Sequence, residues 1–198
     1  KIRPYLAEFD FGQQTGIDLP NEYRGVLPSP EWKEKRFSKL PPERRRWNIA
    51  EMVPISIGQG YNAYTPLQMA HATATLANNG VVYRPHLVKE LLDHNKQQIT
   101  LIDPKPQRVL PFKQSNFNYV KAAMAKVLQP GGTARKIGVG LKYSMGGKTG
   151  TAQVVQIAQG KNYNAAALAE QHRDHAWFIA FAPMEKPQIA IAVILENG

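Results

Sequence analysis

The sequence of 198 residues contains no cysteine. This absence excludes disulfide bonds, thiolate nucleophiles and cysteine-ligated zinc sites within these residues. The sequence also lacks any apolar run near the roughly 20 residues that a membrane-spanning helix needs, so we expect no membrane segment here. It begins with Lys1 rather than methionine and shows no signal peptide. We therefore expect a fragment or a processed piece, with any anchor or leader outside it.

Basic residues outnumber acidic ones by 25 to 15, which gives a formal net charge of +10. Such an excess favours either an anionic partner (a nucleic acid, a membrane surface or an acidic polymer) or an ordinary basic surface. Because acidic residues are interleaved with the basic ones, we prefer the ordinary surface. The densest basic run, residues 33–46, is interrupted by Pro41 and Pro42. We expect it to form solvated loops rather than a nucleic-acid-binding arm.

The hydrophobic share of 43% and the charged share of 20% indicate a globular chain, long enough for one domain. Three sections differ in character. Residues 1–50 form a loop-rich basic section in which Pro and Gly recur, and we expect only short helical pieces there. Residues 51–145 form a predominantly helical section, and residues 146–198 have the character of strands.

The clearest helix begins after Thr65. Thr65 can cap it, Pro66 suits the first helical position, and Gln68 completes a capping box. An Asn-Asn-Gly stretch at 78–80 ends it. Small and apolar residues fall almost all round this helix, which predicts that neighbouring elements bury it.

A strand, a hairpin and a second helix are predicted next. Residues 81–88 predict a short strand or an extended segment, and residues 89–110 predict a hairpin and loops, with a turn near His94 and Asn95. An amphipathic helix follows, capped by Ser115 or Asn116 and stopped by Pro-Gly-Gly at 130–132. Its apolar face comprises Phe117, Val120, Met124, Val127 and Leu128.

Strand character dominates from residue 146 onward. Residues 151–157 predict a strand, and the alanine-rich stretch 162–173 predicts a short helix or an excursion. Residues 177–182 and 188–195 predict two strands joined by a turn at 183–187. Branched apolar residues alternate at 189, 191, 193 and 195, and alanines lie between them. We therefore expect a hairpin with both faces buried.

Residues 146–153, with the sequence Gly-Gly-Lys-Thr-Gly-Thr-Ala-Gln, carry the most chemical information. The glycine pair lets backbone or ligand approach closely. Lys148 offers a positive charge that suits a carboxylate and tunes neighbouring pKa values, and the Thr149 hydroxyl can donate to a carboxylate. Gly150 lets a ligand lie flat against the strand, and the backbone beyond it can donate N–H groups to an oxyanion.

Lys-Thr-Gly alone is a weak signal, since it arises by chance in roughly one chain in twenty of this size. Gly-Lys-Thr also occurs in phosphate-binding loops. Such a loop requires a glycine where this sequence has Lys142, and a helix rather than a strand after it. We therefore reject nucleotide binding.

The neighbours of this segment in the sequence are more specific. Residues 148–153, followed by two apolar strands, resemble the last third of penicillin-binding transpeptidases. Other stretches resemble the same family in order and spacing over nearly the whole chain, namely residues 15–20, 57–61, 65–70, 77–80, 85–88 and 131–134. The chain thus resembles the class B penicillin-binding proteins, and residues 32–33 and 195–198 resemble their elongation-type group, penicillin-binding protein 2.

The resemblance implies an α+β fold, an antiparallel sheet flanked by helices as in serine β-lactamases, incomplete in this chain. It implies a D,D-transpeptidase whose serine attacks the D-alanyl-D-alanine end of a stem peptide and passes the acyl group to a neighbouring strand. The implied partners are peptidoglycan stem peptides, β-lactam antibiotics and, through the parent protein, a membrane glycosyltransferase and elongation-complex proteins, with no nucleic acid. No cofactor is implied. The implied location is the periplasmic face of the bacterial inner membrane.

The resemblance also implies roles for single residues. Lys148 would stand near the nucleophile and maintain the electrostatic field and the proton network. Thr149 would bind the terminal carboxylate of the substrate, and Gly150 would keep the strand open to it. The Thr151 N–H would form half of the oxyanion hole. Gln153 would line the acceptor side of the site.

The family's nucleophile is missing from this sequence. The family requires Ser-x-x-Lys and Ser-x-Asn or Ser-x-Asp, both before the Lys-Thr-Gly element. No serine here has Lys three residues later, or Asn or Asp two residues later; they are Ser29, Ser38, Ser56, Ser115 and Ser144. We expect both motifs to precede Lys1, and this polypeptide alone to be inactive and not acylated by penicillin.

Other interpretations remain open. A serine β-lactamase shares the fold and the Lys-Thr-Gly strand, but the continuation at 151–153 and the long N-terminal half favour the transpeptidase. A non-catalytic β-lactam sensor or peptidoglycan anchor would use the same groove without a nucleophile. A nucleic-acid-binding protein lacks support, because no reading helix or aromatic stacking platform is recognisable.

A few remaining residues are minor candidates. Gln59 and Tyr61 are candidates for approaching the cleft. His172 and His175, with Asp174 between them, suggest a metal site, but we prefer to interpret them as part of a hydrogen-bonded loop before a strand.

Overall fold

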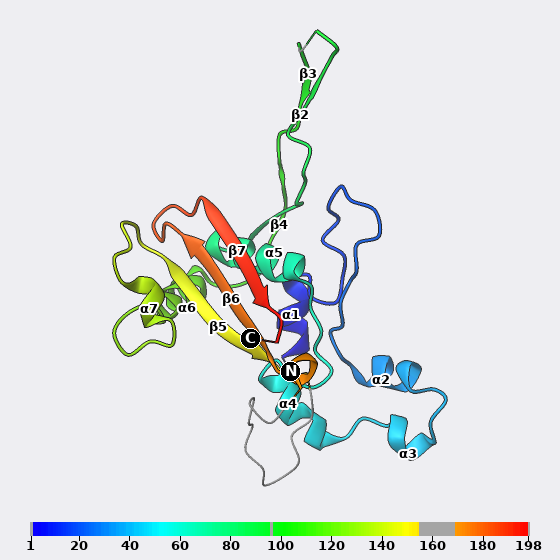
Figure 1. Cartoon of the computed structure of the whole chain (residues 1–198). Helices are drawn as coiled ribbons and strands as arrows, with labels where there is room; N and C mark the ends of the chain where they lie inside the picture. The colour runs from blue at the N-terminus through cyan, green and yellow to red at the C-terminus, as the bar shows by residue number, and fades with distance from the viewer. Residues whose placement is uncertain (1, 96, 155–168, 198) are drawn as a thin grey trace.

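The computed structural model describes residues 2–95, 97–154 and 169–197. Its centre is an antiparallel sheet with the strand order β5-β6-β7, made of β5 (Gly146–Ala152), β6 (His175–Ala182) and β7 (Ile189–Leu195). Two helices pack on one face of this sheet, α5 (Pro66–Ala77) on β6 and β7, and α6 (Gln114–Lys126) on β5 (Figure 1). The predicted α+β architecture, an antiparallel sheet flanked by helices, is therefore confirmed.

The core lies where the two helices meet the sheet. Ala77 of α5, Met124 of α6 and Phe181 of β6 form one buried cluster. The glycine pair at the start of β5 serves this packing: a Cβ atom on Gly146 would lie 2.9 Å from the Phe181 ring, and one on Gly147 would lie 2.7 Å from the Phe178 ring. Both distances are too short for real atoms, so the sequence needs glycine here to let the β6 rings pack against β5.

The outer row of β7 is exposed, which contradicts the expectation of a hairpin buried on both faces. The alternating residues of β7 are 37–62% exposed; they are Ile189, Ile191, Val193 and Leu195. Their apolar character predicted burial, but none of the elements that the structure describes covers this row of side chains. The alanines between them face α5, where Ala190 packs against the core.

The capping box of α5 is confirmed in detail. The Thr65 hydroxyl accepts from the Gln68 N–H, and the Gln68 side chain accepts from the Thr65 N–H. The other end of the Gln68 side chain donates to the carbonyls of Gln13 and Arg24, each at 2.8 Å. With Gln68 only 1% exposed, one side chain both begins the helix and fixes the N-terminal loops against it.

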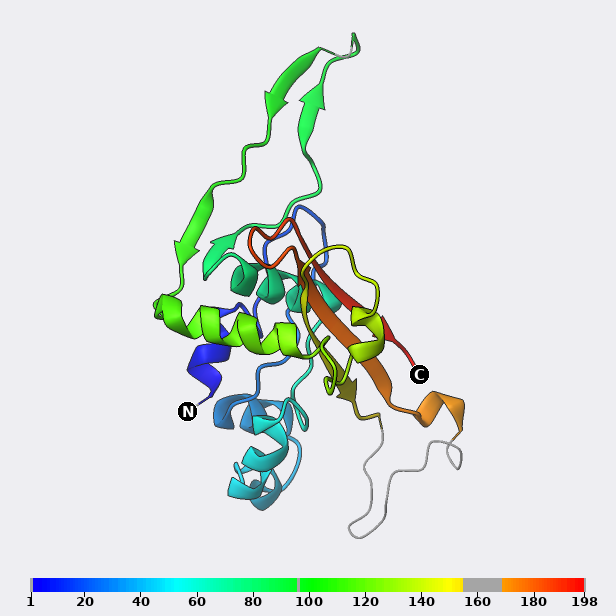
Figure 2. The ribbon, with the colours of Figure 1, turned by 90° about the vertical axis from the view of Figure 1, so that its left-hand side faces the viewer.

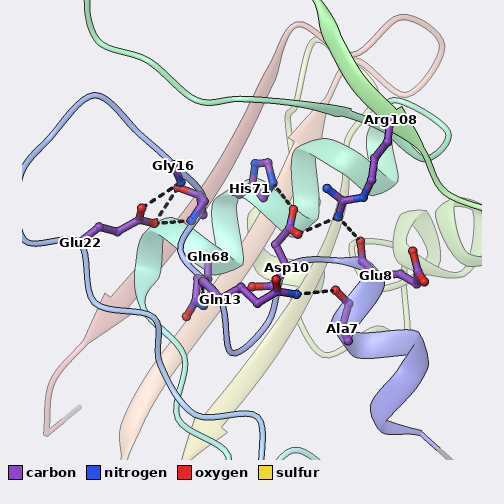
Figure 3. Close-up of polar contacts among 10 residues, drawn as sticks. Ala7, Glu8, Asp10, Gln13, Gly16, Glu22, Gln68, His71 and Arg108 are labelled. Carbon is purple, nitrogen blue, oxygen red and sulfur yellow. Dashed lines mark hydrogen bonds and ion pairs between the residues drawn. The ribbon is translucent and has the colours of Figure 1, made fainter.

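A second polar group fastens the N-terminal segment (Figure 3). The Asp10 carboxylate lies 3.1 Å from His71 of α5 and 2.7 Å from Arg108, which also donates to the Glu8 carbonyl. Burial by itself would raise the pKa of Asp10, but hydrogen bonds from His71 and Arg108, with their charges, hold it below its ordinary value of 3.8. These contacts join residues that lie as far as 100 positions apart in the sequence.

The loop-rich first section contains only short helices, as expected: α1 (Arg3–Glu8), α2 (Pro30–Arg36), α3 (Pro42–Arg45) and η1 (Ile49–Glu51). The helix α4 (Met52–Ser56) follows directly, at the start of the second section. The basic run is not wholly solvated, however. Lys33 is 4% exposed, and its ammonium donates to Glu51 and to the Arg46 carbonyl. The expectation of a solvated run is therefore wrong at Lys33, where a single buried cation ties α2 to η1.

A narrow arm projects from the body (Figures 1 and 2). At its base, β1 (Val81–Tyr83) pairs with β4 (Pro106–Val109), and farther out β2 (Glu90–Leu92) pairs with β3 (Gln98–Leu101). The predicted hairpin is confirmed, and within the strand or extended segment predicted for 81–88 the paired strand ends at Tyr83. Asp18 explains the early end, because its carboxylate accepts the N–H groups of Leu87 and Val88 in place of a partner strand.

The amphipathic helix differs from its prediction at two points. It begins at Gln114 without a side-chain cap, so neither Ser115 nor Asn116 caps it. Val120 is 42% exposed, although Phe117, Met124 and Leu128 are buried as expected. After the helix come α7 (Arg135–Gly138) and, beyond the undescribed stretch, η3 (Glu170–His172). The strand predicted for 151–157 instead ends at Ala152, so that prediction is wrong at Gln153 and Val154. The predictions for 155–157 and 162–168 lie outside the described residues.

Candidate active-site edge

Strand β5 lies at an edge of the sheet, with β6 as its only partner strand in the part of the chain that the structure describes (Figure 1). Lys148 and Gly150 pair with Ile179 and Trp177, and Thr149 pairs with Phe178. Lys148, Gly150 and Thr151 are exposed, and Thr149 is half-buried. The structure therefore presents four of the five predicted site residues together on one accessible strand, and Gln153, also exposed, follows directly.

The direction of the backbone groups follows from one hydrogen bond. The Thr151 carbonyl accepts from the side-chain amide of Gln59 at 2.6 Å, so it points away from β6. In an antiparallel strand, the N–H and C=O of one residue point to the same side. The Thr151 N–H, the predicted oxyanion donor, therefore points to the open edge as well.

The Thr149 hydroxyl has a partner that sequence reasoning missed. It lies 2.8 Å from the hydroxyl of Thr133, in the turn between α6 and α7. Since either oxygen can donate, this pair leaves one hydroxyl hydrogen free for a ligand. The stretch 131–134 already matched the family, but nothing in its spacing to residue 149 indicated a contact.

Lys148 extends along the edge, and its ammonium donates to the Thr149 carbonyl at 2.7 Å. The other two donors of the ammonium have room for an anionic or polar ligand, because the side chain is exposed. The carbonyl of Thr149 is thereby occupied, which leaves N–H groups as the main free backbone groups near the Lys-Thr-Gly segment.

The two minor candidates, Gln59 and Tyr61, lie in different places in the structure. Gln59 reaches β5, since its oxygen also accepts from the Gln153 N–H at 3.4 Å. Tyr61 does not: its ring packs at a tilt against Trp32 and Phe37, and its hydroxyl donates to Glu51 at 3.2 Å. Burial raises the pKa of the Tyr61 hydroxyl, with a further contribution from the Glu51 charge. Tyr61 therefore belongs to the packing of the basic section.

A cleft of about 630 Å³ opens beside the end of β5. It is bounded by Gly150 and Trp177 of the sheet on one side and by α1 and α4 on the other. The cleft contains one serine, Ser56, whose hydroxyl donates to the Val53 carbonyl at 2.8 Å. Ser56 has Gln59 rather than lysine three residues on, so it does not replace the missing nucleophile.

Within the described residues, no group of three or more His, Asp or Glu side chains is arranged to hold a metal ion. His175 of the suspected pair accepts from the Asn197 N–H at 3.0 Å, which links β6 to the end of β7. In the same part of the chain, no helix has the length and apolar character needed to cross a bilayer.

The profile of the penicillin binding protein transpeptidase domain matches residues 1–198. The chain belongs to this family. Among relatives of this penicillin-binding transpeptidase chain is the peptidoglycan D,D-transpeptidase MrdA of Acinetobacter baumannii, 44% identical over all of the chain and 28% of the relative. The MrdA protein of Escherichia coli K12 is 38% identical over all of the chain and 30% of its own length. The chain thus spans less than a third of these relatives.

Solved structures agree with this assignment. The structure of penicillin-binding protein 2 of Pseudomonas aeruginosa in complex with WCK 5153 matches all of the chain and 39% of its own, with 39% identity and a TM-score of 0.75. A complex of penicillin-binding protein 2 with MreC from Helicobacter pylori matches all of the chain and 32% of its own, with 33% identity and a TM-score of 0.76.

Proposed function

We propose that the protein to which this chain belongs is a peptidoglycan D,D-transpeptidase of the penicillin-binding protein 2 type, and that this chain is the C-terminal part of its transpeptidase domain. The observation that carries the proposal is the open edge of β5, where the Lys148 ammonium, the Thr149 hydroxyl and an outward-pointing Thr151 N–H occur within four residues. These are a cation and two donors, which suit an acyl substrate that ends in a carboxylate.

The reaction divides between this chain and the rest of the protein. A serine outside this chain attacks the carbonyl carbon of the penultimate D-alanine, and the C–N bond to the last D-alanine breaks after that nitrogen takes up a proton. The nitrogen lone pair of an amine on a second stem peptide then attacks the acyl carbon, and the ester bond between that carbon and the serine oxygen breaks. The proton lost by the amine passes to the serine oxygen and restores its hydroxyl.

Each predicted residue has one task in this scheme. The Thr149 hydroxyl binds the terminal carboxylate, and the Thr151 N–H stabilises the oxyanion of the tetrahedral intermediate. Lys148 supplies positive charge near the attacked bond and keeps the proton network oriented. Gly150 leaves the strand surface low enough for the substrate to lie along it, and Gln153 lines the side from which the acceptor amine enters.

The proposal extends to place and partners. A substrate of this class is found on the periplasmic side of the bacterial inner membrane, so we place the site there. β-Lactams would occupy the same edge as the stem peptide. A glycosyltransferase and elongation-complex proteins would meet the protein through residues outside this chain; the H. pylori relative forms a complex with MreC.

The test uses the complete parent protein and this chain as a matched control. Each is incubated with benzylpenicillin, and its intact mass is recorded over time. We expect one stable adduct on the parent and none on the chain of residues 1–198. An adduct on this chain would contradict the assigned roles. If the parent stays unmodified, the non-catalytic binding module becomes the preferred interpretation. An adduct that disappears within seconds would indicate a β-lactamase.

A further inference from the structure

We propose that Gln59 is a positioning residue of the transpeptidase site: its side-chain amide holds the end of β5 and aims the Thr151 N–H at the substrate. The inference rests on the proposed function and adds a residue to it. It starts from two contacts that join positions more than 90 residues apart, between the loop after α4 and the edge of the sheet.

The amide of Gln59 imitates a piece of neighbouring strand. Its nitrogen donates to the Thr151 carbonyl at 2.6 Å, and its oxygen accepts from the Gln153 N–H at 3.4 Å. A strand added to this edge would offer the same two groups at the same place. The edge is therefore already filled from the Thr151 carbonyl onward, and a bound peptide can pair only with the groups before it.

The Thr151 N–H belongs to the same residue as the carbonyl that Gln59 holds. Fixing this carbonyl fixes the plane of the peptide bond that follows it, and it limits rotation of Thr151 as a whole. An oxyanion donor is effective only if it is oriented before the charge develops. Exposed strand ends fray, so the end of β5 needs such a restraint, and in the described structure Gln59 supplies one.

Gln59 is itself held firmly by its own loop. Its N–H donates to the Pro54 carbonyl at 2.9 Å, and its carbonyl accepts from the Asn62 side chain at 2.8 Å. The glycines on either side, Gly58 and Gly60, have φ angles of +81° and +69°, which other residues rarely adopt. The Gly-Gln-Gly sequence thus builds a tight turn that points one amide at β5.

The experiment replaces Gln59 in the parent protein and measures acylation by a fluorescent penicillin at several concentrations. Gln59→Met keeps the volume and loses both hydrogen bonds, whereas Gln59→Glu keeps an acceptor for Gln153 and loses the donor to Thr151. Gln97, an exposed glutamine of the β2–β3 hairpin, provides matched controls as Gln97→Met and Gln97→Glu. Thermal unfolding and amide hydrogen exchange of residues 151–153 are recorded for each variant.

We expect both Gln59 variants to lower the limiting acylation rate about tenfold, less than the roughly 10²–10³-fold lost when an oxyanion donor is removed outright. The half-saturating concentration and the melting temperature should stay near wild type, and exchange at 151–153 should accelerate. The Gln97 variants should change none of these.

The possible failures are distinguishable. A wild-type parent that penicillin does not acylate refutes the proposed function and, with it, this role. A wild-type parent that reacts while Gln59→Met and Gln59→Glu react equally fast refutes this role alone. A rate that falls together with the melting temperature, or without faster exchange at 151–153, assigns Gln59 to general loop stability and also overturns the inference.

Discussion

Two groups of polar side chains in this molecule differ in how their hydrogen bonds are used. Around α5, Gln68 and Asp10 are buried or nearly so, and almost every polar atom bonds to another part of the chain (Figure 3). Along β5, the side chains of Lys148 and Thr149 make one hydrogen bond each and remain accessible. The comparison separates stability from function: the first group fastens loops to a helix, and the second keeps donors available for a ligand.

The largest effect is expected at Lys148. In the parent protein, Lys148→Ala should slow acylation by benzylpenicillin about 10²–10³-fold, because it removes the cation placed at the reacting groups. The melting temperature should change little, since the side chain is exposed and its one bond is to a neighbouring carbonyl. Stopped-flow acylation and calorimetry measure the two quantities. A large loss of stability would show that Lys148 stabilises the fold as Gln68 and Asp10 do, and the difference between the two groups of polar side chains would no longer hold.

Gln68 should behave in the opposite way. Gln68→Ala should lower the free energy of unfolding of the parent by about 3 kcal/mol, because it removes one half of the α5 capping box and leaves the carbonyls of Gln13 and Arg24 without this donor. Urea denaturation measures this loss, with Gln97→Ala as the exposed control. Protein that remains folded should acylate at nearly the wild-type rate. A loss under about 0.5 kcal/mol, the range of ordinary surface substitutions, would contradict the assigned role.

The Asp10 group should make stability depend on pH. Because the pKa of Asp10 in the folded protein lies below its ordinary value of 3.8, its stabilisation is complete above that ordinary value. It is lost as the pH falls from there through the lowered pKa of the folded state. The melting temperature should therefore drop on acidification below about pH 4, and Asp10→Asn should flatten part of that drop. If the melting temperature falls equally steeply with pH in wild type and variant, other carboxylates cause most of the acid destabilisation. Glu51, whose pKa is also lowered against the raising effect of burial, is the first to examine.

The smallest expected effect concerns Thr133. Thr133→Val removes the hydroxyl that bonds Thr149 and should slow acylation about fivefold, the worth of one neutral hydrogen bond. Thr133→Ser keeps the hydroxyl and should react like wild type. A Thr133→Ser rate as low as that of Thr133→Val would show that the methyl group, rather than the hydroxyl, matters. The contact would then belong to packing.

Features determined by local sequence were predictable. The α5 cap needs only Thr65, Pro66 and Gln68, whose partners lie within three residues. The β character from residue 146 onward was predicted as well, but the strand expected over 151–157 overlaps β5 only at Thr151 and Ala152. The contacts of Gln59 and Thr133 with β5 were not predictable from spacing, because they depend on how distant loops pack. The family resemblance supplied the chemical roles, which no pattern of periodicity contains.

The errors share a physical cause. Apolar alternation in β7 predicted burial, but whether such a row is covered depends on elements that the row itself does not encode. The basic run predicted solvation at Lys33, yet Glu51, 18 residues away, stabilises that ammonium in the interior. Charge and hydrophobicity indicate what a residue prefers, and the partner that satisfies the preference comes from the tertiary structure.

The projecting hairpin also offers a practical advantage. Its tip, at His94 and Asn95, is exposed and is carried away from β5 by two paired strands (Figure 2). Loop tips of this kind tolerate insertions and attached groups well. Since the sequence contains no cysteine, one introduced at Asn95 would be the single thiol among these residues, so a dye could be attached there to follow ligand binding.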